Sequence, residues 1–122
     1  MRTAFILLLL PVLASRPAAA APSPRQAVDA VHAASLLIER VVPGRAAAFV
    51  VEQIASQEGM DVFEVESRGD RVVLRGSSGV AIASALNWYL EQVAGITIAI
   101  PLRPVALANP LPRVNAPVRI TT

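Results

Sequence analysis

The segment from Arg71 to Leu90, RVVLRGSSGVAIASALNWYL, constrains the fold more than any other part of the chain. Its first residues, RVVLR, favour a β-strand, and the run after Gly79 repeats its apolar residues at helical spacing. The strand passes into the helix through four small residues, Gly76-Ser77-Ser78-Gly79, with no further linker. Such a junction predicts a layered fold in which a helix packs back against a sheet.

Periodicity predicts the other elements. Helices are expected at residues 25–42 and 80–93, and strands at 49–54, 61–67, 71–75 and 96–100. The strands at 61–67 and 71–75 form a hairpin around Arg68-Gly69-Asp70. The order helix, strand, hairpin, helix, strand predicts an α+β fold: a small layer of two helices packed on one face of a mostly antiparallel sheet of three or four strands.

One domain accounts for residues 22–100. From Pro101 onward the chain changes character, because proline removes a backbone donor and fixes φ. The prolines of this segment are Pro101, Pro104, Pro110, Pro112 and Pro117. Residues 101–122 are therefore predicted to be an irregular exit segment.

Residues 1–21 have the pattern of a secretory signal peptide. Arg2 supplies the positive charge, Ala4 to Leu10 opens the apolar stretch, and Ala18 to Ala21 offers the small residues that a signal peptidase reads. The apolar stretch is shorter than the roughly 20 residues that a membrane-spanning helix needs. The sequence therefore predicts export to the periplasm or beyond the cell, with cleavage before Pro22 and no membrane attachment afterwards.

The charge balance argues against a nucleic-acid partner. The chain has 11 basic and 9 acidic residues, and Arg2 and Arg16 leave with the signal, so the mature part is formally neutral. A nucleic-acid-binding domain needs a basic face. The chain has no cysteine, so an exported domain of this size depends on an apolar core rather than on disulfides.

The Gly76-Ser77-Ser78-Gly79 turn has two interpretations. Free backbone N–H groups and the helix dipole meet there, as in an anion-binding turn. The Lys-Ser/Thr ending of a Walker loop and the Gly-x-Ser-x-Gly pattern of a nucleophile elbow are both absent. The pattern favours a helix N-cap, in which a serine hydroxyl accepts a hydrogen bond from a free N–H.

Titratable residues offer no clear catalytic group. His32 is the only histidine, so no transition-metal site or other cofactor is predicted, and a dyad with Ser35 on the same helix is poorly oriented for a pocket. Glu64 and Glu66 share a strand face about 7 Å apart, a spacing that a glycosidase pair requires, but exposed strand faces are commonly charged. The adhesion-like tripeptide Arg68-Gly69-Asp70 suits a hairpin turn. No catalytic residue is predicted.

Trp88 and its neighbour Asn87 are the candidate docking residues. The predicted helix places Trp88 on its polar side, with Asn87 and Glu91. A tryptophan left in water forgoes about 1.5–3 kcal/mol of burial free energy. Either the proline-rich segment covers the ring or another domain docks on it.

The segment RGSSGVAIASALNWYLEQVAGITIAIPLRPVALANPLP resembles the amino-terminal domain of the alpha-N-acetylglucosaminidases, glycosidases that remove terminal alpha-linked N-acetylglucosamine. The resemblance depends on Gly76 to Val80, on Leu86 to Leu90 and on Leu111-Pro112, and it extends over most of residues 26–122. Small α+β domains with the same strand–Gly–helix pattern also precede the barrels of hexosaminidases and glucuronidases.

In that family the domain is followed by a TIM barrel that carries the catalytic glutamates. No family catalytic motif matches a position of this chain, so the resemblance implies a non-catalytic accessory domain whose partner is the catalytic barrel. A different hypothesis is a stand-alone carbohydrate-binding or interaction module. That role would need aromatic residues along one surface, and the mature chain offers only Phe49, Phe63, Trp88 and Tyr89.

Overall fold

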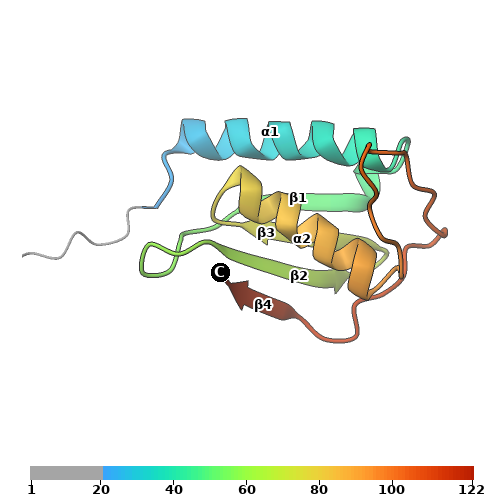
Figure 1. The fold of residues 1–122 in the computed structure, drawn as a ribbon. Coiled ribbons are helices and arrows are strands. Elements are labelled where there is room, and N and C mark those ends of the chain that lie inside the picture. Colours follow the sequence, from blue (N-terminus) through green and yellow to red (C-terminus); the bar gives the residue numbers. More distant parts are fainter. Residues whose placement is uncertain (1–20) are drawn as a thin grey trace, which may run out of the picture.

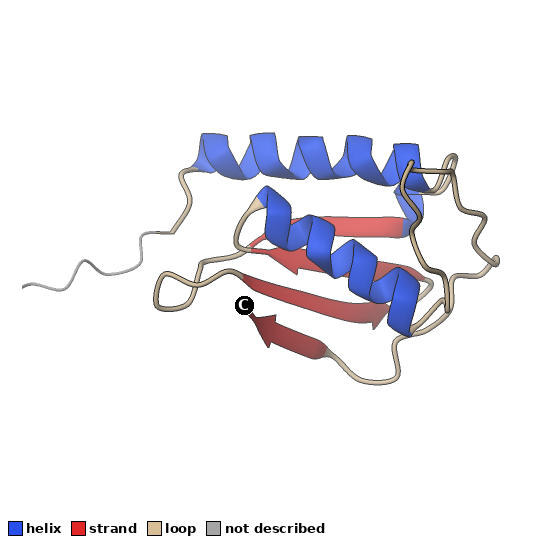
Figure 2. Ribbon diagram, in the orientation of Figure 1, coloured by secondary structure: helices blue, strands red, loops and turns tan. Residues whose placement is uncertain are grey.

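Two helices lie on one face of a four-stranded sheet in the computed structural model, which describes residues 21–122 (Figures 1 and 2). The helices are α1 (Pro24–Val41) and α2 (Gly79–Gln92), and the strands are β1 (Phe49–Gln53), β2 (Val62–Arg68), β3 (Arg71–Gly76) and β4 (Val118–Thr121), with a short 3-10 helix at Ala46–Ala48. The predicted signal peptide lies outside the described residues except for Ala21. The described helices include none long and apolar enough to cross a bilayer.

The strands lie in the order β1-β3-β2-β4. β1 runs parallel to β3, whereas β2 pairs antiparallel with both β3 and β4. The turn Gly69-Asp70 joins β2 to β3, with Arg68 opposite Arg71 and Gly69 at φ +60°. The prediction of an α+β layer with a mostly antiparallel sheet is confirmed.

Helix α1 begins with a reciprocal cap. The Ser23 hydroxyl accepts a hydrogen bond from the backbone of Gln26, whose side chain accepts one from the backbone of Ser23, and Pro24 occupies the first turn. This arrangement satisfies donors that a helix start otherwise leaves free. Its apolar stripe then buries Ala34, Ile38 and Val41 against the sheet side of the fold.

The core lies between the helices and the inner face of the sheet. Alternate residues of the strands point into it, and α2 contributes most of its length. The side chains that are completely or almost completely buried there are Ile38, Val41, Val42, Val65, Val72, Leu74, Ile82, Ala85, Leu86, Tyr89 and Leu90. Gly76 lets α2 approach β3 closely, because a Cβ there would lie 2.4 Å from the Ile82 nitrogen.

The predicted strand at residues 96–100 is wrong. The chain is irregular after α2, and the Ile100 side chain is 98% exposed. The edge of β2 that a strand at residues 96–100 would occupy pairs with β4 instead. The segment is apolar enough for a strand but has no partner strand.

The prediction that residues 101–122 are irregular throughout is also wrong, because Val118–Thr121 forms β4. Pro117 is the last proline, so the four following residues keep the N–H groups that a ladder needs, and three of them, Val118, Ile120 and Thr121, are β-branched. Before β4 the segment is fastened to the domain by Val105 N–H, which donates to the Val41 carbonyl at 2.7 Å, and by the buried Leu111.

Candidate docking surface

The Gly76-Ser77-Ser78-Gly79 turn is filled by a carboxylate of the chain itself. Ser78 is the N-cap of α2, and its hydroxyl accepts from Ala81 N–H at 3.1 Å. The hydroxyls of Ser77 and Ser78 donate to the two oxygens of Asp61 at 2.8 and 3.1 Å. A carboxylate is favourable at the positive end of a helix dipole. The anion bound at this turn is therefore Asp61, so the turn between β3 and α2 is a structural junction that also holds the residue before β2.

The other titratable candidates are also accounted for. His32 is exposed on α1, and the Ser35 hydroxyl donates to its own helix, at the Val31 carbonyl 2.9 Å away, so the two form no dyad. Within residues 21–122 no cluster of three acidic or histidine side chains is placed to hold a metal ion.

Glu64 and Glu66 belong to a row of charges on the outer face of the sheet, opposite the helices. The row crosses all four strands in the order Glu52, Arg75, Glu64, Arg119. Arg75 donates to Glu52 at 2.7 Å, to Glu66 at 2.8 Å and to Glu64 at 3.4 Å, and Arg119 pairs with Glu64.

This network closes the outer face. Val73 lies on that face, opposite Val50 of β1 and Glu66 of β2, and is completely buried there. The hydrogen bond from Arg75 is the main cause that lowers the pKa of Glu66. Glu66 is therefore held in the ionised form by arginine, and Glu64 pairs with Arg75 and Arg119 in the same structural network.

The lowered pKa makes a prediction about acid stability. The folded chain lowers the pKa of Glu66 below its ordinary value of 4.5. The contribution of this carboxylate to the free energy of unfolding is therefore complete above pH 4.5, and it is lost as the pH falls through the folded-state pKa. Glu66→Gln should therefore cost about 0.5–1 kcal/mol at pH 7 and make the loss of stability below the ordinary pKa of 4.5 shallower. Urea unfolding at stepped pH measures both.

The control for this prediction is Glu91→Gln, which changes an exposed carboxylate outside the network. It should leave the pH dependence as in the unsubstituted chain. If Glu66→Gln and Glu91→Gln give the same pH dependence, the network has no part in acid stability.

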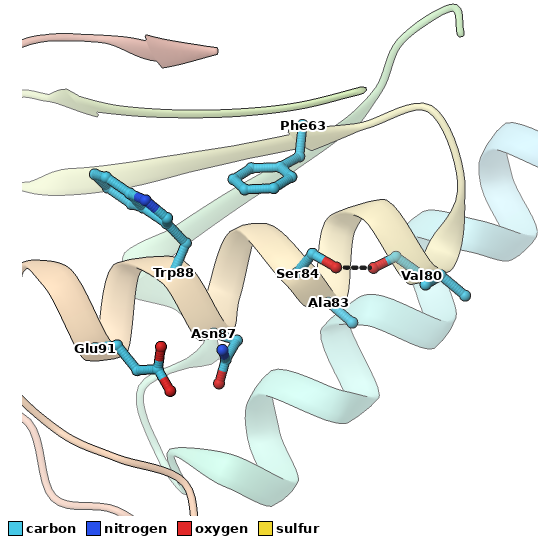
Figure 3. Close-up of a pocket in the computed structure, with 7 residues that line it drawn as sticks. All are labelled: Phe63, Val80, Ala83, Ser84, Asn87, Trp88 and Glu91. Atoms are coloured by element: carbon cyan, nitrogen blue, oxygen red, sulfur yellow. Dashed lines mark hydrogen bonds between the residues drawn. The ribbon is translucent and has the colours of Figure 1, made fainter. Parts of the chain in front are cut away.

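An open groove of about 480 Å³ runs along the flank of α2 (Figure 3). Six of its seven lining residues recur at helical spacing, and Phe63 of β2 forms the floor; the seven are Phe63, Val80, Ala83, Ser84, Asn87, Trp88 and Glu91. Val80, at the rim, is 72% exposed. Beyond Phe63 lies its cross-strand neighbour Ile120 of β4, which is itself only partly buried. The groove is thus an apolar channel with polar groups on one side.

The position of Trp88 on the helix predicts a polar face, but the face that carries Trp88 is only partly polar. Its ring turns toward Phe63 and packs partly against the core, while Asn87 and Glu91 point away from the sheet (Figure 3). The proline-rich segment does not line this groove; the aromatic residue that shares the groove with Trp88 is Phe63 of β2 (Figure 3). Trp88 and Asn87 therefore occupy one groove, with an apolar floor and a hydrogen-bonding rim.

Three features of the surface are missing from the sequence interpretation. Asp61 gives no signal of its role, because its serine partners are 16 and 17 residues away. Phe63 alternates as a core residue and is 6% exposed, yet it also forms the groove floor. The third, the exposed Ile100, lies in a segment whose composition predicts burial.

Comparison with known proteins identifies the domain. The family model described as the alpha-N-acetylglucosaminidase (NAGLU) N-terminal domain matches residues 32–113. Human alpha-N-acetylglucosaminidase is 35% identical over 93 residues, which are 73% of this chain and 12% of the human protein. The chain thus spans about an eighth of the length of that relative.

Solved structures agree with this match. A family 89 glycoside hydrolase from Clostridium perfringens, in complex with 2-acetamido-1,2-dideoxynojirmycin, superposes with a TM-score of 0.71 and 27% identity over 80% of this chain and 11% of that one. The same hydrolase in complex with PUGNAc gives a TM-score of 0.69 and 28% identity over 78% of this chain. The sequence match and the shared fold cover the same unit: the chain belongs to the alpha-N-acetylglucosaminidase family, of which it contains the N-terminal domain.

Proposed function

We propose that this chain is a non-catalytic accessory domain of an exported alpha-N-acetylglucosaminidase-like glycosidase, and that it packs against the catalytic domain of such an enzyme. The observation that carries the proposal is the match to an N-terminal domain that makes up only 11–12% of the relatives. The groove beside Trp88 supports a packing role, because it is open and mainly apolar, and its lining residues come from α2 and, through Phe63, from β2.

The use of the acidic residues supports the non-catalytic part of the proposal. Glycosidases need two carboxyl groups that flank a bound sugar, one of them able to donate a proton. Glu64 and Glu66 instead pair with arginines on the outer sheet face, on the opposite side of the sheet from the groove. In the proposal, catalytic carboxylates come from the neighbouring domain.

Hydrolysis of an aryl alpha-N-acetylglucosaminide tests the proposal. The chain alone is expected to release no more aglycone than the buffer does, while the Clostridium perfringens enzyme serves as the positive control under the same conditions. A Glu64→Gln, Glu66→Gln double variant is the matched background. Release above the buffer rate that disappears in the double variant would show that this chain is itself a hydrolase.

Export is proposed on the pattern of residues 1–21 alone. The mature chain should begin at Pro22, as read by mass spectrometry of protein secreted or released from the periplasm. Leu8→Arg, which interrupts the apolar stretch, should leave the chain inside the cell with residues 1–21 attached. An intact N-terminus on exported protein would contradict the proposal.

A carbohydrate-binding role is the second candidate, and one observation favours it. The groove brings Trp88 together with Asn87 and Glu91, which are an aromatic ring and hydrogen-bonding groups of the kind that sugar sites use. Because Trp88 is the only tryptophan, its fluorescence reports on the groove directly. Saturable quenching by N-acetylglucosamine, with none by glucose, would favour this role over domain packing.

A further inference from the structure

An apolar loop, residues 96–102, projects where the chain passes from the end of α2 toward the end of α1 (Figure 1). Ile100 at its tip is 98% exposed and Leu102 is 41% exposed. No charged residue occurs between Glu91 and Arg103. Residues 96–102 thus have the composition of a buried strand, yet the described part of the chain leaves Ile100 exposed to solvent.

Hydrogen bonds on both sides hold this loop in place. At its start, Ile96 N–H donates to the Leu90 carbonyl at 2.7 Å, and at its end Val105 N–H donates to the Val41 carbonyl at 2.7 Å. Ile98, between them, packs against the core. The two sides of the loop are therefore held against the domain, and Ile100 projects from between them.

Arg45 holds the chain just beyond the loop. Its guanidinium donates to the carbonyls of Leu107 and Ala108 at 3.1 and 3.2 Å, which connects this part of the chain to the segment before β1. An apolar side chain that is already held in position loses little conformational entropy when a partner covers it. Anchors of this kind, seated in a pocket of the partner, carry much of the binding free energy of an interface.

We propose that residues 96–102 are a second docking element of the domain, that Ile100 is its anchor, and that its partner is the catalytic portion of an alpha-N-acetylglucosaminidase. This inference rests on the proposed function and deepens it. The family match at residues 32–113 contains the whole loop together with Arg45, so the loop belongs to the domain that the family shares. In the solved relatives this domain is 11% of the chain, which leaves a large remaining body available to receive it.

The chemistry of the loop fits that partner. A loop without charge is suited to an apolar pocket on a folded protein, where shape rather than ion pairing positions the contact. The loop lies beside the C-terminal ends of α1 and α2 (Figure 1). The network around Arg75 lies on the face of the sheet opposite the helices, so it takes no part in the loop. Docking through the loop and the α2 groove would bury the exposed apolar groups of this part of the domain and leave the ionic face free.

Co-expression tests the inference. The full chain, carrying a C-terminal tag, is expressed with the Clostridium perfringens family 89 enzyme from which the N-terminal domain has been removed, and the amount of enzyme that co-purifies is measured. Ile100→Asp is expected to reduce the recovered enzyme at least tenfold, and Ile100→Leu is expected to retain it. Val28→Asp is the matched control, because Val28 is 68% exposed on α1, away from the loop. Circular dichroism checks that each variant keeps the wild-type helix content.

The possible outcomes separate this inference from the proposed function. If Ile100→Asp recovers as much enzyme as the wild-type chain while Trp88→Asp does not, the packing role holds and the loop inference is wrong. If the wild-type chain recovers no enzyme, both are wrong. The loop inference is also overturned if Ile100→Asp instead dissociates a homodimer in sedimentation velocity, or abolishes flotation with phosphatidylcholine–phosphatidylglycerol vesicles, because a second copy or a membrane would then be the partner.

Discussion

A single methyl group at position 76 is expected to destabilise the chain by about 3 kcal/mol or more, which lowers Tm by about 12–24 °C for a domain of this size. In Gly76→Ala the new Cβ would lie 2.4 Å from the Ile82 nitrogen and 2.8 Å from the Ala81 carbonyl carbon. Both are backbone atoms of the first turn of α2, so no side chain can rotate to make room.

The position of Gly76 prevents the strand from yielding instead. It is the last residue of β3 and lies between Gln53 of β1 and Phe63 of β2, so a shift of β3 disturbs two ladders at once. The helix is held equally, because Asp61 fastens its N-cap through Ser78 at 3.1 Å. The strain therefore falls on the β3–α2 contact itself.

Gly79→Ala is the matched control, three residues further along the same turn. A Cβ at Gly79 meets nothing within 4 Å, and alanine is a better helix former than glycine by about 1 kcal/mol. This variant should melt at the wild-type temperature or slightly above it. Thermal and urea unfolding followed by circular dichroism measure both variants. A Gly76→Ala protein that melts within a few degrees of wild type would show that α2 does not approach β3 as closely as described.

Removal of the Tyr89 ring is expected to cost about 3–5 kcal/mol, comparable to the whole stability of a small domain. Tyr89 is completely buried, and its ring meets that of Phe49 edge to face, with centroids 5.7 Å apart. Its hydroxyl donates to the Pro112 carbonyl at 2.7 Å. Burial raises the pKa of Tyr89 to about 12, so the phenol remains a donor at neutral pH. Tyr89→Ala thus loses both the packed ring and the tether.

Tyr89→Phe isolates the tether. It should cost about 1–2 kcal/mol, because the ring stays and one hydrogen bond to a part-buried carbonyl is lost. Hydrogen exchange by mass spectrometry should show faster exchange in residues 103–117. Ser84→Ala is the control, since that hydroxyl bonds only its own helix, at the Val80 carbonyl 3.0 Å away, and should change stability by less than about 0.5 kcal/mol. Unchanged exchange in Tyr89→Phe would mean that Leu111 and the backbone contacts hold the segment by themselves.

The tether matters for function because the same segment shapes the candidate docking elements. Residues 93–117 leave α2, present the loop at 96–102, pass the end of α1 and return to the sheet as β4 (Figure 1). Tyr89 fixes the middle of this path at Pro112, and the Ser67 hydroxyl fixes the next part by accepting from Val114 N–H at 2.8 Å. The proline-rich segment therefore completes the domain as well as leading out of it.

The amino-acid sequence by itself determined the local elements and the family. Apolar spacing placed both helices and the first three strands within a few residues, and the pair Gly69-Asp70 marked the hairpin turn. Ser78 is the N-cap that the turn chemistry favours. The resemblance carried by residues 76–90 and by Leu111-Pro112 agrees with the family match at residues 32–113. Each of these signals is written in consecutive residues, because capping, turn formation and amphipathic spacing act over one or two turns of chain.

Only the tertiary structure decided which segments pair as strands of the sheet. It also decided which apolar side chains remain exposed. Composition favoured residues 96–100 as the last strand, yet β2 pairs with Val118–Thr121, and Ile100 remains exposed. Trp88 is half-buried against a core that includes Phe63, 25 positions earlier in the chain. Glu64 meets Arg119 across 55 positions of sequence. Such contacts depend on which distant segments lie side by side after the chain has folded. The periodicity within one segment does not specify its neighbours in space.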